Sequence, residues 1–161
     1  MDRKSNSSKW LFYISILAVA LAVASCDRKT IYHHYEHTPL SGWEKDDTLF
    51  FSMKPITQAA VLHRDIELRT DDSYPFRSLN LIVEQTTFPS RLIRRDTLDC
   101  QLVTPDGTML GRGITLYQYR FRLPDVSLTE GDSLSLSIHH NMRRETLPGI
   151  ADVGIRMTAA D

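Results

Sequence analysis

The sequence has 161 residues, of which 42% are hydrophobic and 24% are charged, and its formal net charge at pH 7 is −1. This length suits one ordinary domain, and the composition is that of a globular protein rather than a disordered, collagen-like or repeat protein. A nearly neutral chain also lacks the basic surface expected of a nucleic-acid-binding protein.

The first 25 residues have the pattern of an export signal. Residues 1–9 carry three basic side chains and one acidic side chain, and residues 10–23 are apolar apart from Ser15. A helix over residues 10–23 would span roughly 21 Å. That is shorter than the ~30 Å hydrocarbon core of a bilayer and is typical of a signal peptide. We therefore expect residues 1–25 to be removed on export.

Cys26 follows small residues directly after this signal. The string Val23-Ala24-Ser25-Cys26 resembles the lipobox of bacterial lipoproteins, which implies lipid attachment to the Cys26 thiol and cleavage just before it. Several acyl chains on one residue would make the membrane attachment effectively permanent. The alternative is a plain secretory signal followed by an incidental cysteine. We expect residues 26–31 to form a lipid-anchored tether.

The remaining chain alternates apolar and polar residues with the period of two that is typical of β-strands. A first strand is expected around residues 31–37, and the clearest alternation runs from Thr115 to Leu123. Turn-forming residues such as Pro124-Asp125 separate the strands, and Asp106-Gly107 is typical of a tight hairpin turn. The other predicted strands cover residues 48–53, 63–69, 79–85, 96–103, 133–138 and 150–157.

Seven or eight short strands, each with one apolar and one polar face, predict an all-β fold. We expect residues 32–161 to form a single antiparallel β-sandwich of immunoglobulin-like or jelly-roll-like type, with a closed barrel as the alternative. Cys100 alternates with apolar neighbours, and lipidation of Cys26 would leave it without a partner. We therefore expect a buried, inert thiol at Cys100.

The histidines near the start of the mature chain raise the question of a metal site. His33, Tyr35 and His37 share one face of the expected strand, and paired histidines suit zinc or copper. A zinc site needs three or four ligands, whereas the adjacent His139 and His140 would point to opposite faces of their strand. We therefore expect a polar edge strand, with no metal and no cofactor.

Catalytic motifs are absent from the sequence. It contains no G-x-S-x-G elbow, H-E-x-x-H motif or P-loop. Asp46-Asp47 and Asp71-Asp72 lie in turn-like segments, where carboxylates are usually solvated. Gly111-Arg112-Gly113 leads into a strand and indicates either a bulge or a close backbone approach. We predict that the protein is not an enzyme and acts on no small-molecule substrate, with a hydrolase of hidden active site as the weakest alternative.

A candidate contact surface lies between the last two predicted strands. Met142, Arg143 and Arg144 belong to residue types that are enriched at protein interfaces. The alternative is an ordinary charged loop in which the methionine packs under the sandwich.

Three aromatic residues suggest a second possible function. Trp43 could cap the core or present a flat ligand platform, and Tyr117 and Tyr119 share one strand face. An exposed aromatic row would suit a sugar, so a surface or periplasmic glycan-binding β-sandwich is the alternative function. Burial of these side chains would remove its platform.

Four motifs together indicate a family. They are Tyr74-Pro75-Phe76-Arg77-Ser78-Leu79, Pro105-Asp106-Gly107, Gly111-Arg112-Gly113, and His140-Asn141-Met142-Arg143 followed by Leu147-Pro148-Gly149-Ile150-Ala151-Asp152-Val153-Gly154-Ile155-Arg156. From about residue 26 to the C-terminus the chain resembles the gliding-motility lipoprotein GldH family of Bacteroidetes. The resemblance implies an envelope accessory or scaffold lipoprotein that supports gliding motility or the associated type IX secretion apparatus, with other envelope proteins as partners and no known catalytic residues.

The residues after Cys26 bear on the location. Asp27 is followed by Arg28 and Lys29, so no acidic run adjoins the lipidation site. Surface-exported lipoproteins of Bacteroidetes often carry such a run. The resemblance therefore implies a lipid-anchored protein on the periplasmic side of the outer membrane.

Overall fold

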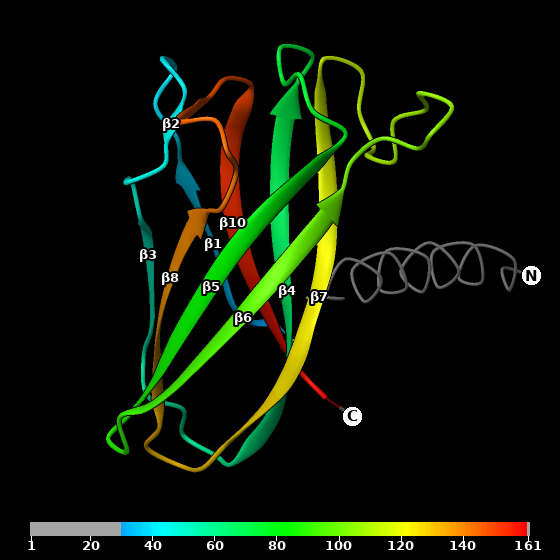
Figure 1. Cartoon of the computed structure of the whole chain (residues 1–161). Coiled ribbons are helices and arrows are strands. Elements are labelled where there is room, and N and C mark those ends of the chain that lie inside the picture. Colours follow the sequence, from blue (N-terminus) through cyan, green and yellow to red (C-terminus); the bar gives the residue numbers. More distant parts are fainter. Residues whose placement is uncertain (1–29, 161) are drawn as a thin grey trace, which may run out of the picture.

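The computed structural model describes residues 30–160, which form ten β-strands and no helix (Figure 1). The strands are β1 (Thr30–His37), β2 (Trp43–Glu44), β3 (Leu49–Met53), β4 (Ala60–Asp71), β5 (Ser78–Phe88), β6 (Leu92–Gln101), β7 (Leu116–Leu128), β8 (Ser133–His140), β9 (Thr146–Leu147) and β10 (Ile150–Ala159). The predicted signal peptide, Cys26 and residues 27–29 lie outside the described residues. Between residues 30 and 160, no helix is long and apolar enough to cross a bilayer.

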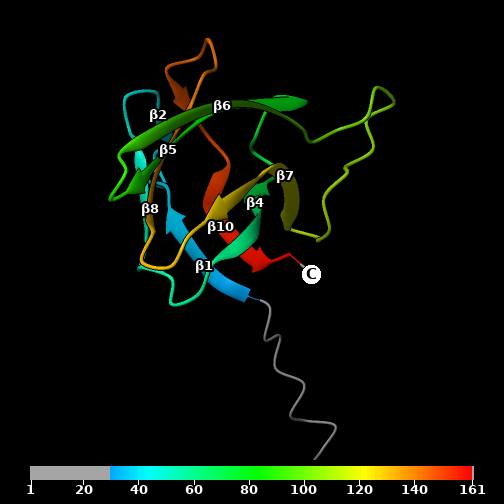
Figure 2. The ribbon, with the colours of Figure 1, turned by 90° about the horizontal axis from the view of Figure 1, so that it is seen from below.

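The strands form two four-stranded antiparallel sheets and one small ribbon. The first sheet has the order β1-β10-β4-β7 and the second has the order β3-β8-β5-β6, while β2 pairs with β9. Figure 2, viewed from the end where β1 begins, shows the two sheets as two layers. The predicted antiparallel β-sandwich is thus confirmed, and the two sheets stay separate instead of closing on each other.

The sequence pattern located the long strands but misjudged some of their limits. All seven ranges of alternating residues fall on β3 to β8 and β10. The predicted turn at Pro124-Asp125 is wrong, because β7 continues through both residues to Leu128. The two-residue strands β2 and β9 were not predicted, since they are too short to show a period. β1 begins at Thr30, two residues before the predicted start of the domain.

The core lies between the two sheets and follows the alternation of the strands. β5, for example, buries Leu79, Leu81 and Val83 completely, and the residues between them are partly exposed. On the opposite sheet, Ile66 of β4 and Ile155 of β10 are also fully buried. Burial of such side chains contributes roughly 1.5–3 kcal/mol each, and it supplies the main stabilisation of a domain that has no disulfide among its described residues.

A charged side chain lies inside this core. Arg64 stands on the inward face of β4, in alternation with Leu62 and Ile66, and is fully buried. Its Nε donates to the Pro124 carbonyl at 2.8 Å and its Nη1 donates to Gln85 Oε1 at 2.7 Å. Because Gln85 belongs to the other sheet, Arg64 ties the two layers together. Burial lowers the Arg64 pKa, although the Asp96 carboxylate opposes this effect.

Candidate functional site

The residues 38–48 and 141–149 form one end of the sandwich, which we name the distal tip because it lies at the far end of β1 from Thr30 (Figure 1). β2 and β9 join these two loops, with Trp43 opposite Leu147 and Glu44 opposite Thr146. A further backbone hydrogen bond runs from the Lys45 N–H to the Glu145 carbonyl at 2.8 Å. The two loops therefore form one supported unit.

Trp43 holds the distal tip on the core. Its side chain is fully buried, and its indole Nε1 donates to the Asp47 carbonyl at 2.9 Å. The ring also packs edge-on against His140, with ring centroids 5.3 Å apart. His140 is fully buried as well, and burial lowers its pKa, so the imidazole is neutral at pH 7. Trp43 is thus the core-capping aromatic, which was one of its two predicted roles.

The structure divides the predicted contact set. Met142 is half-buried and packs against the core, and its sulfur accepts a hydrogen bond from the Asn80 N–H at 3.4 Å. Arg143 and Arg144 are exposed. On the other loop of the distal tip, Leu40 is also fully exposed. Two arginines and one leucine are therefore presented on a base that Trp43 and Met142 fix.

A second ordered surface covers the outer side of the β1-β10-β4-β7 sheet, which we name the polar face. Three rows of paired residues cross its four strands in register. The rows are His33-Arg156-Asp65-Arg122, Tyr35-Gly154-Glu67-Arg120 and His37-Asp152-Arg69-Gln118. Several opposite charges face each other across neighbouring strands: Asp65 beside Arg122, Glu67 beside Arg120, and Asp152 beside Arg69. Such pairs favour cross-strand attraction.

Glu67 is the centre of the polar face and its side chain is only 1% exposed. One carboxylate oxygen, Oε2, accepts hydrogen bonds from His33 Nε2 at 2.8 Å and from the Tyr35 hydroxyl at 2.5 Å. The other, Oε1, accepts a hydrogen bond from Arg120 Nε at 2.9 Å and forms an ion pair with Arg120 Nη2 at 2.7 Å. A buried carboxylate is stable only with such partners, so Glu67 fixes three side chains from β1 and β7.

The electrostatics of this cluster favour an ionised Glu67. Burial by itself raises the pKa of Glu67, but the hydrogen bonds from Tyr35 and His33 and the nearby Arg120 outweigh it and leave the pKa below its usual value. Burial and then the hydrogen bond to Glu67 raise the pKa of Tyr35 to about 12. Tyr35 therefore stays a donor, and Arg69 lies over its ring at 4.1 Å from the centroid.

The histidines face carboxylates rather than one another. His33 pairs with Glu67, and His37 pairs with Asp152 through its Nδ1. Within residues 30–160, no group of three or more His, Cys, Asp or Glu side chains is arranged to hold a metal ion. Sequence reasoning placed His33 and His37 on one strand face correctly, but it missed Glu67, whose partners come from strands far away in the chain.

The three aromatic residues that were candidates for a glycan-binding platform do not form an exposed row. Trp43 is fully buried, Tyr119 is 5% exposed and Tyr117 is half-buried. The predicted close backbone approach at Gly111 is confirmed, because a β-carbon there would lie 2.6 Å from the Tyr119 ring. These residues therefore belong to the packed end of β7 and do not form an exposed row.

The other candidate groups have structural roles. Cys100 is a free, fully buried cysteine, and burial followed by the neighbouring Asp99 charge raises the pKa of its thiol well above the usual range. Asp71 accepts hydrogen bonds from the Ser73 N–H and hydroxyl, which is the pattern of a turn carboxylate. The predictions of a buried thiol and a turn carboxylate are both confirmed.

Comparison with known proteins gives a clear family. The family model described as GldH lipoprotein matches residues 30–157. The chain belongs to the GldH family. It is 30% identical over 153 residues to the gliding motility lipoprotein GldH of Flavobacterium johnsoniae, which covers 91% of this chain and 95% of that protein. It is also 29% identical over 167 residues to a GldH homolog of Christiangramia forsetii, covering 98% and 99% of the two chains.

This membership confirms the resemblance predicted from the C-terminal motif, and it supports a lipid-anchored location in the cell envelope. Among solved structures, a 4-O-methyl-α-glucuronidase of family GH115 aligns with a TM-score of 0.45 and 13% identity, over 85% of this chain and 18% of that enzyme. The Yersinia pseudotuberculosis-derived mitogen aligns with a TM-score of 0.38 and 9% identity, over 83% and 88% of the two chains. At these TM-scores, neither likeness carries an argument about this chain.

Proposed function

We propose that this member of the GldH family is a lipid-anchored accessory or scaffold lipoprotein that supports gliding motility or an associated secretion machinery. It would act by binding other envelope proteins and not by catalysis. Relatives that match almost the whole chain are gliding motility lipoproteins, and Cys26 stands in a lipobox-like string. The acyl chains on Cys26 would hold the protein on the periplasmic side of the outer membrane.

The position of the distal tip is the observation that carries this proposal. The chain enters the sandwich at Thr30, and β1 then runs eight residues to His37, which is about 26 Å in a strand. An anchor at Cys26 would therefore place the distal tip on the side away from the membrane. Arg143 and Arg144 are exposed there, and arginine is among the residues enriched at protein interfaces.

A binding role also agrees with where the polar side chains lie. The hydrogen-bonded cluster around Glu67 lies on an open sheet face, and the Glu67 oxygens hold His33, Tyr35 and Arg120. A carboxylate that is already occupied in this way is poorly suited to exchange protons with a substrate. The cluster instead stiffens the sheet that connects the anchored end to the distal tip.

In-cell crosslinking tests this proposal. A C-terminally tagged chain with Cys26 intact is crosslinked in its native host, purified and analysed by mass spectrometry. We expect envelope proteins of the motility or secretion machinery, and we expect their recovery to fall in the double variant Arg143→Ala/Arg144→Ala. The matched control is Arg94→Ala/Arg95→Ala, which removes two adjacent exposed arginines from β6.

Each result has a distinct meaning. Equal recovery of partners from the tip variant and the control would remove the distal tip as the contact surface. Recovery of polysaccharide in place of protein partners would favour the glycan-binding alternative. The anchor is tested separately with Cys26→Ala, which should no longer incorporate labelled fatty acid, while a variant that labels as well as the wild-type chain would refute lipid attachment at Cys26.

A further inference from the structure

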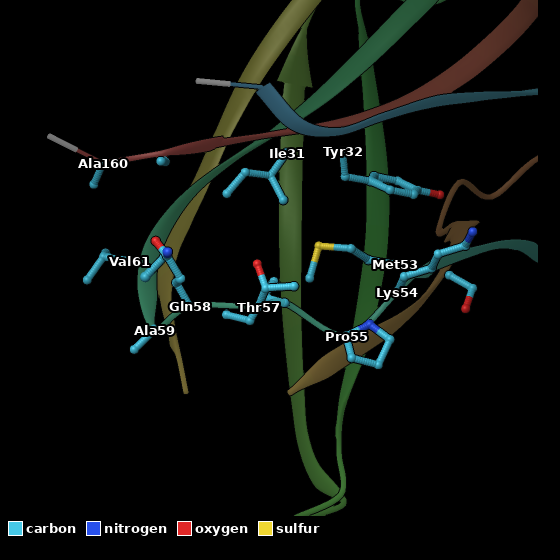
Figure 3. A pocket seen from close by; sticks show the side chains of 14 residues that line it. Ile31, Tyr32, Met53, Lys54, Pro55, Thr57, Gln58, Ala59, Val61 and Ala160 are labelled. Carbon is cyan, nitrogen blue, oxygen red and sulfur yellow. The ribbon is translucent and has the colours of Figure 1, made fainter. Parts of the chain in front are cut away.

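A groove opens between the two sheets at the end where β1 begins. It lies between the start of β1, the connection from β3 to β4 at residues 54–59, and the end of β10. Its volume is about 1040 Å³, at the upper end of the roughly 300–1,000 Å³ that small-molecule pockets have. Figure 3 shows Ile31, Met53, Thr57 and Val61 around the hollow. We name it the proximal groove.

The proximal groove is lined mainly by apolar groups. Met53 and Ile56 are 4% and 9% exposed, whereas Ile31 and Val61 on the rim remain 41% and 44% exposed. Lys54 is the only charged side chain among the described lining residues, and they include no His, Asp, Glu or Cys. A groove with this lining suits an apolar ligand.

The groove stays open because of the way the two edge strands meet. β1 and β3 belong to opposite sheets and face each other without a strand between them. β3 ends at Met53, where the chain turns away toward β4, so the first residues of β1 have no strand opposite them. The apolar gap between the layers is therefore accessible at this end.

A β-bulge turns Ile31 toward the proximal groove. The register between β1 and β10 shifts between Thr30 and Tyr32. In a regular strand Ile31 would point to the same side as His33, onto the polar face. The bulge at Ile31 changes that direction. Figure 3 shows its side chain directed into the hollow. The point where the chain enters the domain thus carries an apolar side chain that contributes to the rim of the groove.

We propose that the proximal groove holds one acyl chain of the lipid on Cys26. This inference rests on the proposed lipid attachment at that residue. Cys26 lies four residues before Thr30, a span of at most roughly 14 Å, so the lipid begins within reach of Ile31. Each CH₂ group that leaves water for an apolar surface favours the bound state by roughly fourfold, so a few groups are enough to keep the groove occupied.

An acyl chain bound in the proximal groove would be shielded from water. This matters when the protein is in aqueous solution and not inserted in a bilayer. In a bilayer the same chain is already in apolar surroundings, so its transfer out of the groove costs little. The groove therefore favours a soluble, carried form of the lipoprotein without opposing its final insertion in the membrane.

A photoactivatable fatty acid tests the proposal on the full chain. Cells are fed a fatty acid that bears a diazirine and an alkyne, and the lipidated protein is purified and diluted below the critical micelle concentration of the detergent. After irradiation, we expect mass spectrometry to find a crosslink between the Cys26 peptide and the peptide that contains Met53 to Val61. Mixing ¹⁴N-labelled and ¹⁵N-labelled protein identifies crosslinks within one chain.

Two tryptophan variants provide the comparison. Thr57→Trp places a large ring in the groove and should lower the crosslink about tenfold, because losing contact with two or more CH₂ groups is enough for such a change. Phe50→Trp alters an exposed side chain of β3 that does not line the groove, and its crosslink should stay within about twofold of the wild-type value. Ile31→Glu, which adds a charge at the rim, should also lower the crosslink if the first variant folds poorly.

The remaining outcomes separate this inference from the anchor. A fatty-acid label on Cys26 without any crosslink to the groove would overturn the groove proposal and leave the lipoprotein standing. A groove peptide linked to a phospholipid-derived chain, or crosslinks only between different copies, would also overturn it. Absence of the label from Cys26 would refute the anchor, and the groove proposal with it.

Discussion

Gly154 is the position at which a single methyl group should disrupt the polar face. It lies on β10 between Tyr35 and Glu67 in the same row of the sheet. A β-carbon at this position would lie 2.6 Å from two carbons of the Tyr35 ring, which is far inside van der Waals contact. Gly154→Ala therefore has to displace the ring, and the Tyr35 hydroxyl then loses its 2.5 Å hydrogen bond to Glu67.

The size of the effect follows from these contacts. A hydrogen bond to a charged group contributes about 1.5–3 kcal/mol, and the Arg69–Tyr35 cation–π contact contributes about 0.5–1 kcal/mol. Replacing glycine by alanine within a strand returns about 0.5–1 kcal/mol. We therefore expect Gly154→Ala to lower the free energy of unfolding by about 2 kcal/mol.

Equilibrium unfolding in urea measures this change. Trp43 is a suitable reporter, because it is fully buried and is the only tryptophan after residue 10. A double-mutant cycle with Tyr35→Ala separates the ring contact from other effects of the methyl group. In the Tyr35→Ala background, Gly154→Ala should cost nothing or should stabilise slightly. An equal cost in both backgrounds would show that the ring does not rest on Gly154, and the reasoning would then fail.

Three further predictions concern the interior. Arg64→Met should lower the free energy of unfolding by about 2 kcal/mol, because Gln85 loses its buried donor; the double variant Arg64→Met/Gln85→Leu should recover part of this loss in urea unfolding, and no recovery would contradict the bridge between the sheets. Because burial lowers the His140 pKa below its ordinary value of about 6.5, its contribution to stability should be complete above that pH and decline as the pH falls through the folded-state pKa. His140→Gln should therefore weaken the pH dependence of unfolding below pH 6.5 while His139→Gln does not, and equal slopes for the two variants would argue against this assignment. Cys100 should react with a thiol reagent only in denaturant, and rapid labelling of the native protein would contradict its complete burial.

Features that depend only on neighbouring residues could be predicted from the amino-acid pattern. The period of two between Thr115 and Leu123, and between Ser133 and Ile138, follows from the alternation of side chains along any strand. For this reason the fold class and the long strands could be predicted from local pattern alone. The family could also be predicted, because the string from His140 to Arg156 is continuous in the chain.

Which strands pair, and which side chains they bring together, depends on contacts between distant parts of the chain. Glu67 stands between two apolar residues of β4, and nothing next to it in sequence indicates that β1 and β7 supply its partners. Nor does local pattern show that Arg64 meets Gln85 of the other sheet, or that a bulge turns Ile31 toward the proximal groove. A bulge depends on how two distant strands pair, so it cannot be predicted from either strand alone. It also interrupts the alternation of apolar and polar residues that predicts which side chains are buried. The burial of Trp43 likewise depends on the pairing of β2 with β9, since a two-residue strand is formed by its partner and not by its own pattern.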